Sequence, residues 1–81
     1  MSGKTVLIAD DEERITSLIA DFLKAAGINS IIAHDGDEAL RLIKSGNKAD
    51  LAIIDIMMPG LDGWALTKEI RKTETFPIIM L

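Results

Sequence analysis

The 81-residue sequence contains no cysteine, one histidine and only three aromatic residues. Without cysteine there can be no disulfide bond, zinc–thiolate site or thiol nucleophile, so side-chain packing has to stabilise the fold. Long hydrophobic runs are missing as well. The apolar stretch after Met1–Lys4 is too short for the core of a signal peptide or for a membrane span. We therefore expect a cytoplasmic protein with no membrane partner.

Positive charge is also scarce. Nine basic residues stand against 13 acidic ones, which gives a net charge of −4 and no basic surface for direct contact with nucleic acid. The content of 48% hydrophobic and 27% charged residues is typical of a globular chain, and we predict that residues 1–81 form a single domain. Doubly wound α/β domains usually need about 100 to 150 residues, so the length predicts that only part of such a domain is present.

Short apolar runs alternate with amphipathic segments along the whole chain. Helical spacing of apolar residues predicts helices at about residues 13–26, 36–45 and 63–72, the first ending at Gly27. Runs rich in Val and Ile predict buried strands at Thr5–Ala9, Ser30–Ala33, Asp50–Ile54 and Phe76–Leu81. This order predicts an α/β fold with a doubly wound parallel sheet, and we expect the strand order 2-1-3-4 because it would bring Asp10 and Asp11 beside Asp55. Right-handed crossovers would place the first helix on one face and the other two on the opposite face.

Acidic residues follow two of these strands directly. Asp10 and Asp11 come after the first strand and Asp55 after the third, so the three carboxylates are expected to converge at one edge of a parallel sheet. Each could instead simply end a strand, and Glu12 and Glu13 are better explained as partners of the helix dipole. Three neighbouring carboxylates repel one another unless protons or a cation relieve the charge, and oxygen ligands without His or Cys favour Mg²⁺ over zinc. Beside such an ion, a carboxylate is expected to accept a phosphoryl group.

Two motifs carry a resemblance to a known family. Asp10-Asp11-Glu12 after one strand and Asp55-x-x-Met58-Pro59-x-x-Asp62-Gly63 after another resemble the receiver domain of two-component response regulators, whose fold is flavodoxin-like. The resemblance implies that Asp55 is the phosphoacceptor for a sensor histidine kinase. It also implies that Asp11, Asp55 and the backbone carbonyl of Met57 bind Mg²⁺, that Asp10 acts through water, and that the parent protein carries an output domain. Such a module signals and is not an enzyme in the usual sense.

The sequence departs from the family pattern beyond the fourth strand. Receivers have a Thr or Ser after that strand and a Lys at the end of a fifth, and the sequence reaches Leu81 before either position. This departure allows an alternative function, in which the chain is a truncated or engineered fragment that binds metal but does not signal. The fourth strand would then be an apolar sheet edge, which predicts a homo-oligomer. A small phosphohydrolase is a weaker alternative, because such enzymes show Asp-x-Asp after the first strand.

Two single residues allow more than one interpretation. Trp64 is expected either to pack under the turn that follows Asp55 or to contact a partner. His34 is the only histidine, and we assign it no role, because a lone histidine before a helix cap is usually structural or exposed to solvent.

Overall fold

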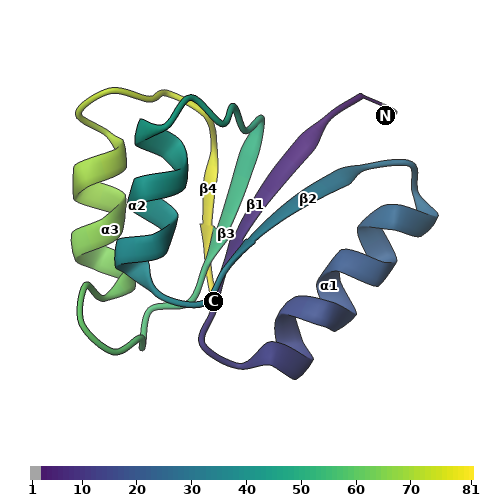
Figure 1. Cartoon of the computed structure of the whole chain (residues 1–81), viewed down its shortest axis with the longest axis horizontal. Coiled ribbons are helices and arrows are strands. Elements are labelled where there is room, and N and C mark those ends of the chain that lie inside the picture. Colours follow the sequence, from purple (N-terminus) through teal and green to yellow (C-terminus); the bar gives the residue numbers. More distant parts are fainter. Residues whose placement is uncertain (1–2) are drawn as a thin grey trace.

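The computed structural model describes residues 3–81, so the first two residues of the predicted domain lie outside the described part. Strands and helices alternate along the chain in the order β1 (Thr5–Ala9), α1 (Glu13–Ala25), β2 (Asn29–Ala33), α2 (Gly36–Lys44), β3 (Leu51–Ile54), α3 (Gly63–Ile70) and β4 (Ile78–Met80). The strands form one parallel sheet in the order β2-β1-β3-β4, which confirms the predicted flavodoxin-like arrangement. As predicted, α1 lies on one side of the sheet and α2 and α3 on the other (Figure 1).

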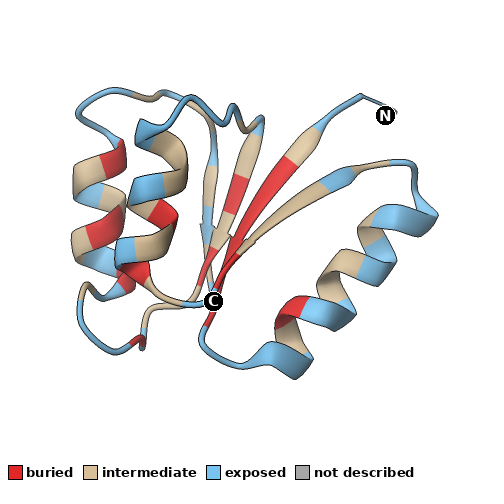
Figure 2. Cartoon of the chain, in the orientation of Figure 1, coloured by how far each residue is buried: buried red, intermediate tan, exposed pale blue. Residues whose placement is uncertain are grey.

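The main core lies between the sheet and the pair α2 and α3. β1 occupies an inner position in the sheet, and its Leu7, Ile8 and Ala9 are at most 1% exposed. Figure 2 shows buried residues along β1 and β3 and on the helix faces turned toward them. The buried side chains of this cluster are Leu7, Ala9, Ala33, Ala39, Ala52, Ile54, Met58, Leu66 and Ile70. Because both inner strands are apolar on both faces, their polar residues can lie only at the strand ends.

The opposite side of the sheet is less well covered. α1 contacts β1 and β2, and its apolar stripe follows the predicted spacing. Two members of that stripe nevertheless face solvent, since Leu18 is 55% and Phe22 71% exposed. Within residues 3–81 no second helix lies beside α1 on this side (Figure 1). Ile79 in β4 and Leu81 just after it are also about half exposed, at 48% and 52%.

Local signals set the helix ends, with small differences from the predicted bounds. α1 is followed by Gly27, whose φ of 77° is in the left-handed region that favours glycine. α2 is capped by Asp35, whose Oδ1 accepts a hydrogen bond from the Glu38 N–H at 2.7 Å. Asp35 and Glu38 have the spacing of a capping box, but the Glu38 carboxylate accepts from the N–H of His34, at 2.7 Å, and not from that of the cap residue.

The last two elements are shorter than predicted. After Ile70 the backbone tightens into turns, because the N–H groups of Lys72 and Thr73 bond to carbonyls three residues back, so α3 ends before Lys72. β4 begins at Ile78 and not at Phe76, since Pro77 has no N–H to donate to the sheet. The Pro77 carbonyl still accepts a hydrogen bond from Ala52, at 3.0 Å.

Candidate metal centre

The pairing of β1 with β3 brings the predicted acidic residues together. Ala9 lies opposite Ile54 in the parallel register, so Asp10 and Asp55 follow on neighbouring strands. The backbone N–H of Asp55 donates to the Ala9 carbonyl at 2.9 Å, and that of Asp10 donates to the Ala33 carbonyl at 3.1 Å. Carboxylate oxygens of Asp10, Asp11 and Asp55 all lie within 4.8 Å of one another. The predicted convergence of these three side chains is therefore present in the structure.

The three carboxylates differ in their exposure. Asp10 is only 4% exposed, Asp55 is half-buried and Asp11 is exposed. Burial raises the pKa of Asp10 above its usual value, and the negative charges of Asp55, Asp11 and Glu12 raise it further. A hydrogen bond from the Glu12 N–H to Asp10 Oδ1, at 2.9 Å, opposes this rise in pKa. The hydrogen bond from Glu12 thus does not fully offset the burial and the neighbouring negative charges at this site.

The loop after β3 surrounds Asp55 with backbone groups. The N–H of Met57 donates to Asp55 Oδ1 at 3.3 Å, and the N–H of Gly63 donates to the Ile56 carbonyl at 3.0 Å. Asp62 caps α3, because its Oδ1 accepts a hydrogen bond from the Ala65 N–H at 2.9 Å. The loop is therefore closed by hydrogen bonds at both ends, and it keeps Met57 beside the carboxylate of Asp55.

The donor set suits a hard divalent cation. Three carboxylates offer anionic oxygens from different backbone positions, and they leave room in the coordination sphere for water, as Mg²⁺ prefers. His34 is not part of this group, since its Nδ1 lies 3.3 Å from Glu38 Oε1 at the start of α2. Glu12 and Glu13 lie at the N-terminal end of α1 and not in the acidic group, in agreement with a dipole role.

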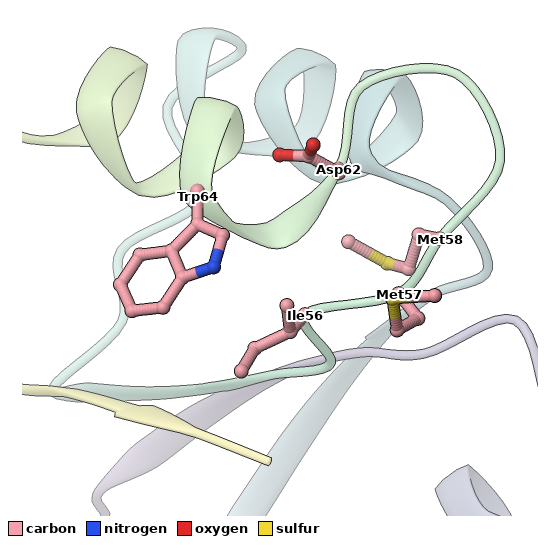
Figure 3. A pocket seen from close by; sticks show the side chains of 5 residues that line it. All are labelled: Ile56, Met57, Met58, Asp62 and Trp64. Atoms are coloured by element: carbon pink, nitrogen blue, oxygen red, sulfur yellow. The ribbon is translucent and has the colours of Figure 1, made fainter.

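A hollow of about 600 Å³ lies beside the same loop, lined by Ile56, Met57, Met58, Asp62 and Trp64. Figure 3 shows these side chains around it, with the indole of Trp64 projecting from the first turn of α3. Trp64 is 61% exposed, so the expectation that it packs under the turn is wrong. Met57 is 79% exposed, whereas Met58 is buried in the core. This hollow could not be predicted, because helical spacing alone does not show whether Trp64 faces the sheet or the solvent.

Comparison with known proteins identifies the class to which this fold and acidic group belong. Residues 6–81 match the family model described as the response regulator receiver domain. The chain therefore belongs to the receiver-domain family of two-component response regulators.

Individual relatives support this assignment. The transcriptional regulatory protein CpxR of Klebsiella pneumoniae is 41% identical over 76 residues, which cover 94% of this chain and 32% of that protein. The transcriptional regulatory protein PhoP of Bacillus subtilis, named for alkaline phosphatase synthesis, is 42% identical over 80 residues, covering 98% of this chain and 33% of that protein. The chain thus spans about a third of the length of these relatives.

Solved receiver structures share the fold. The receiver domain of the Francisella response regulator 1452 is 42% identical, with a TM-score of 0.88 over 96% of this chain and 64% of that one. The response regulator TrrA of Thermotoga maritima, solved in complex with Mg²⁺ and a beryllium fluoride, is 41% identical. Its TM-score is 0.86, and the match covers 95% of this chain and 67% of that one.

We predict that Asp10→Asn stabilises the metal-free protein near neutral pH. The substitution keeps the oxygen that accepts from Glu12 but removes a buried charge whose pKa is raised above its usual 3.8. A raised pKa in the folded state means that stability falls as the pH rises through that pKa, so the gain should be present at about pH 7 and absent below about pH 3.8. Urea unfolding with a chelator present, at both pH values, measures the difference.

The exposed Asp21→Asn on α1 provides the control, since it makes the same change in net charge away from the site. A stability gain in Asp10→Asn no larger than in Asp21→Asn, or one of equal size at both pH values, would contradict the prediction.

Proposed function

We propose that this chain accepts a phosphoryl group on Asp55 from a sensor histidine kinase. The observation that carries the proposal is the convergence of Asp10, Asp11 and Asp55, with carboxylate oxygens within 4.8 Å of one another at the ends of two neighbouring parallel strands. Membership of the receiver-domain family supports the same function. Residues 1–81 would act as one unit that supplies the acidic part of the site.

Each acidic residue has a separate part in the proposal. Asp11 and Asp55 would bind Mg²⁺ directly, together with the backbone carbonyl of Met57, and the buried Asp10 would act through a water molecule. Mg²⁺ held by these residues would supply positive charge to neutralise the oxygens of the incoming phosphoryl group beside Asp55. The beryllium fluoride complex of the Thermotoga maritima relative, which contains Mg²⁺, supports this choice of ion.

The half-buried Asp55 is the best placed of the three to act as the nucleophile. It lies between the β3 strand and the loop that holds Met57, so its backbone N–H is bound to the Ala9 carbonyl in the sheet and its carboxylate accepts from the Met57 N–H. A carboxylate oxygen of Asp55 attacks phosphorus, and the bond from phosphorus to the imidazole nitrogen of the donor histidine breaks. The electron pair of that bond remains on the nitrogen, and the product is an aspartyl phosphate.

The wider setting of the chain is also part of the proposal. Relatives described as transcriptional regulators are about three times as long as the region they share with this chain. We therefore propose that the parent protein couples phosphorylation of Asp55 to an output domain and acts in the cytoplasm. Within residues 3–81, no helix has both the length and the apolar character that crossing a membrane requires.

Binding of Mg²⁺ should depend on Asp55 and Asp11. We expect weak binding by the wild-type chain, no measurable binding by Asp55→Ala and reduced binding by Asp11→Ala, because each change removes an anionic oxygen ligand from a site with few. The fluorescence of Trp64 is a direct probe, since its exposed ring lies in the hollow that Met57 also lines. Asp21→Ala is the control for net charge, and equal affinities in Asp55→Ala and the wild type would rule the site out.

Phosphorylation should map to Asp55 alone. Incubation with acetyl phosphate and Mg²⁺, followed by borohydride reduction of the aspartyl phosphate and peptide mass spectrometry, identifies the modified residue. We expect the label on Asp55 and not on Asp10 or Asp11, with no label when Asp55 is replaced by Asn. Labelling that persists in Asp55→Asn, or that lies on either of the other two residues, would overturn the assignment.

We also propose that the 81-residue chain, prepared by itself, self-associates through β4. This strand lies at the edge of the sheet, and Ile79 and Leu81 are about half exposed there, at 48% and 52%. An exposed apolar edge strand pairs readily with another chain. Sedimentation equilibrium at micromolar concentration should show dimers or larger species, and Ile79→Lys should shift the population toward monomer. A wild-type chain that is folded and wholly monomeric would exclude this association.

A further inference from the structure

The first turn of α3 lies directly against the backbone of Asp55. Gly63, the first residue of that helix, is buried, and a Cβ atom added there would meet the Asp55 carbonyl oxygen at once. The same atom would lie 2.8 Å from the Ile56 Cα and 3.0 Å from the Asp55 carbonyl carbon. All three neighbours are backbone atoms, so none can move aside by a change of rotamer. A side chain at position 63 would therefore displace either α3 or the peptide that carries Asp55.

The need for glycine here is one of space and not of backbone conformation. Among the described residues, the glycines with positive φ are Gly3, Gly27, Gly46 and Gly60, and Gly63 is not one of them. One hydrogen bond of Gly63 joins the two segments, and a second lies within α3. The Gly63 N–H donates to the Ile56 carbonyl at 3.0 Å, and the Gly63 carbonyl accepts from the Thr67 hydroxyl at 2.8 Å.

A second glycine holds the far end of the same loop. A Cβ atom on Gly36, at the start of α2, would collide with the Leu61 carbonyl oxygen and lie 2.9 Å from the Leu61 Cβ. Gly60 lies close to α2 as well, since its Cβ would be 3.2 Å from Asp37 Oδ2. The loop is therefore confined between the first turns of two helices, but only Gly63 touches the residue that carries the proposed phosphoacceptor group.

We propose that Gly63 is a positioning residue for the acidic site. By allowing α3 to rest on the Asp55–Ile56 peptide, it fixes the Asp55 carboxylate beside Asp10 and Asp11 and keeps the Met57 N–H directed at it. The importance of Gly63 for metal binding and phosphorylation rests on the proposed function. The mechanical part of the inference is that Gly63 determines the position of the Asp55 backbone, and it depends only on the contacts described above.

The mechanical part is tested by amide hydrogen exchange in Gly63→Ala. We expect the N–H groups of Asp55 and Met57 to lose protection by at least about tenfold more than those of β1, because the local structure opens before the whole fold does. Ile70→Val is the matched control. It removes one methyl from a fully buried side chain at the other end of the same helix, and it should lower protection evenly across the chain. An even loss of protection in Gly63→Ala as well would overturn the inference.

The chemical part is tested by calorimetric titration with Mg²⁺. Displacement of residues that support metal ligands typically costs about 10- to 100-fold in affinity, and we expect a loss of this size in folded Gly63→Ala. Ile70→Val should bind Mg²⁺ as the wild type does. If Gly63→Ala binds Mg²⁺ as tightly as Ile70→Val, Gly63 does not position the site.

Two further outcomes keep the inference separate from the proposed function. If the wild type binds no Mg²⁺, the metal part of the proposed function fails, while hydrogen exchange still decides the role of Gly63. If Gly63→Ala does not fold, backbone NMR of the wild type replaces the measurements on this variant. The Gly63 amide signal should then shift on Mg²⁺ addition together with those of Asp55 and Met57, and an unchanged Gly63 signal would overturn the inference.

Discussion

The site depends on one backbone pairing, that of β1 with β3. The parallel register sets Ala9 opposite Ile54, and the hydrogen bond from the Asp55 N–H to the Ala9 carbonyl extends the pairing one residue beyond the strand. A shift of this register by one residue would turn the side chain of Asp55 to the other face of the sheet, because successive side chains of a strand point to opposite faces. The chemistry of the site therefore rests on apolar residues that take no part in it.

The acidic group weakens the fold that holds it. Asp10 is buried beside two other carboxylates, and its raised pKa records that the folded chain disfavours its ionised form. The fold tolerates this loss of stability because β1 is almost completely buried, with Leu7, Ile8 and Ala9 at most 1% exposed. A cation at the site would reverse the sign of this effect, since the same three charges would then attract it. Binding of metal and stability of the fold are in this way coupled through Asp10, Asp11 and Asp55.

Much of the fold could be predicted from the sequence, because the short apolar runs and the acidic residues at their ends are local signals. The strand order followed from right-handed crossovers combined with the requirement that Asp10 and Asp11 lie beside Asp55. Side-chain exposure could not be predicted in the same way. Phe22 belongs to a well-formed helical stripe and is still 71% exposed, because exposure depends on which elements cover that side of the sheet. For Trp64 the sequence left packing and partner contact both open for a related reason, since periodicity does not fix how a short helix is rotated.

The role of Gly63 was missed because a glycine after an N-cap residue has an ordinary local explanation, and its contact with Asp55 depends on three-dimensional packing. This contact separates the two tasks of the loop. Its backbone supports Asp55 through the Met57 N–H, which donates to Asp55 Oδ1, and through the Gly63 N–H, which donates to the Ile56 carbonyl, whereas the side chains of Met57 and Trp64 project into solvent at 79% and 61% exposure. The position of Asp55 is thus set by backbone contacts of the loop and by the buried Gly63. The surface beside it is formed by the exposed side chains of Met57 and Trp64, which are not part of these backbone contacts.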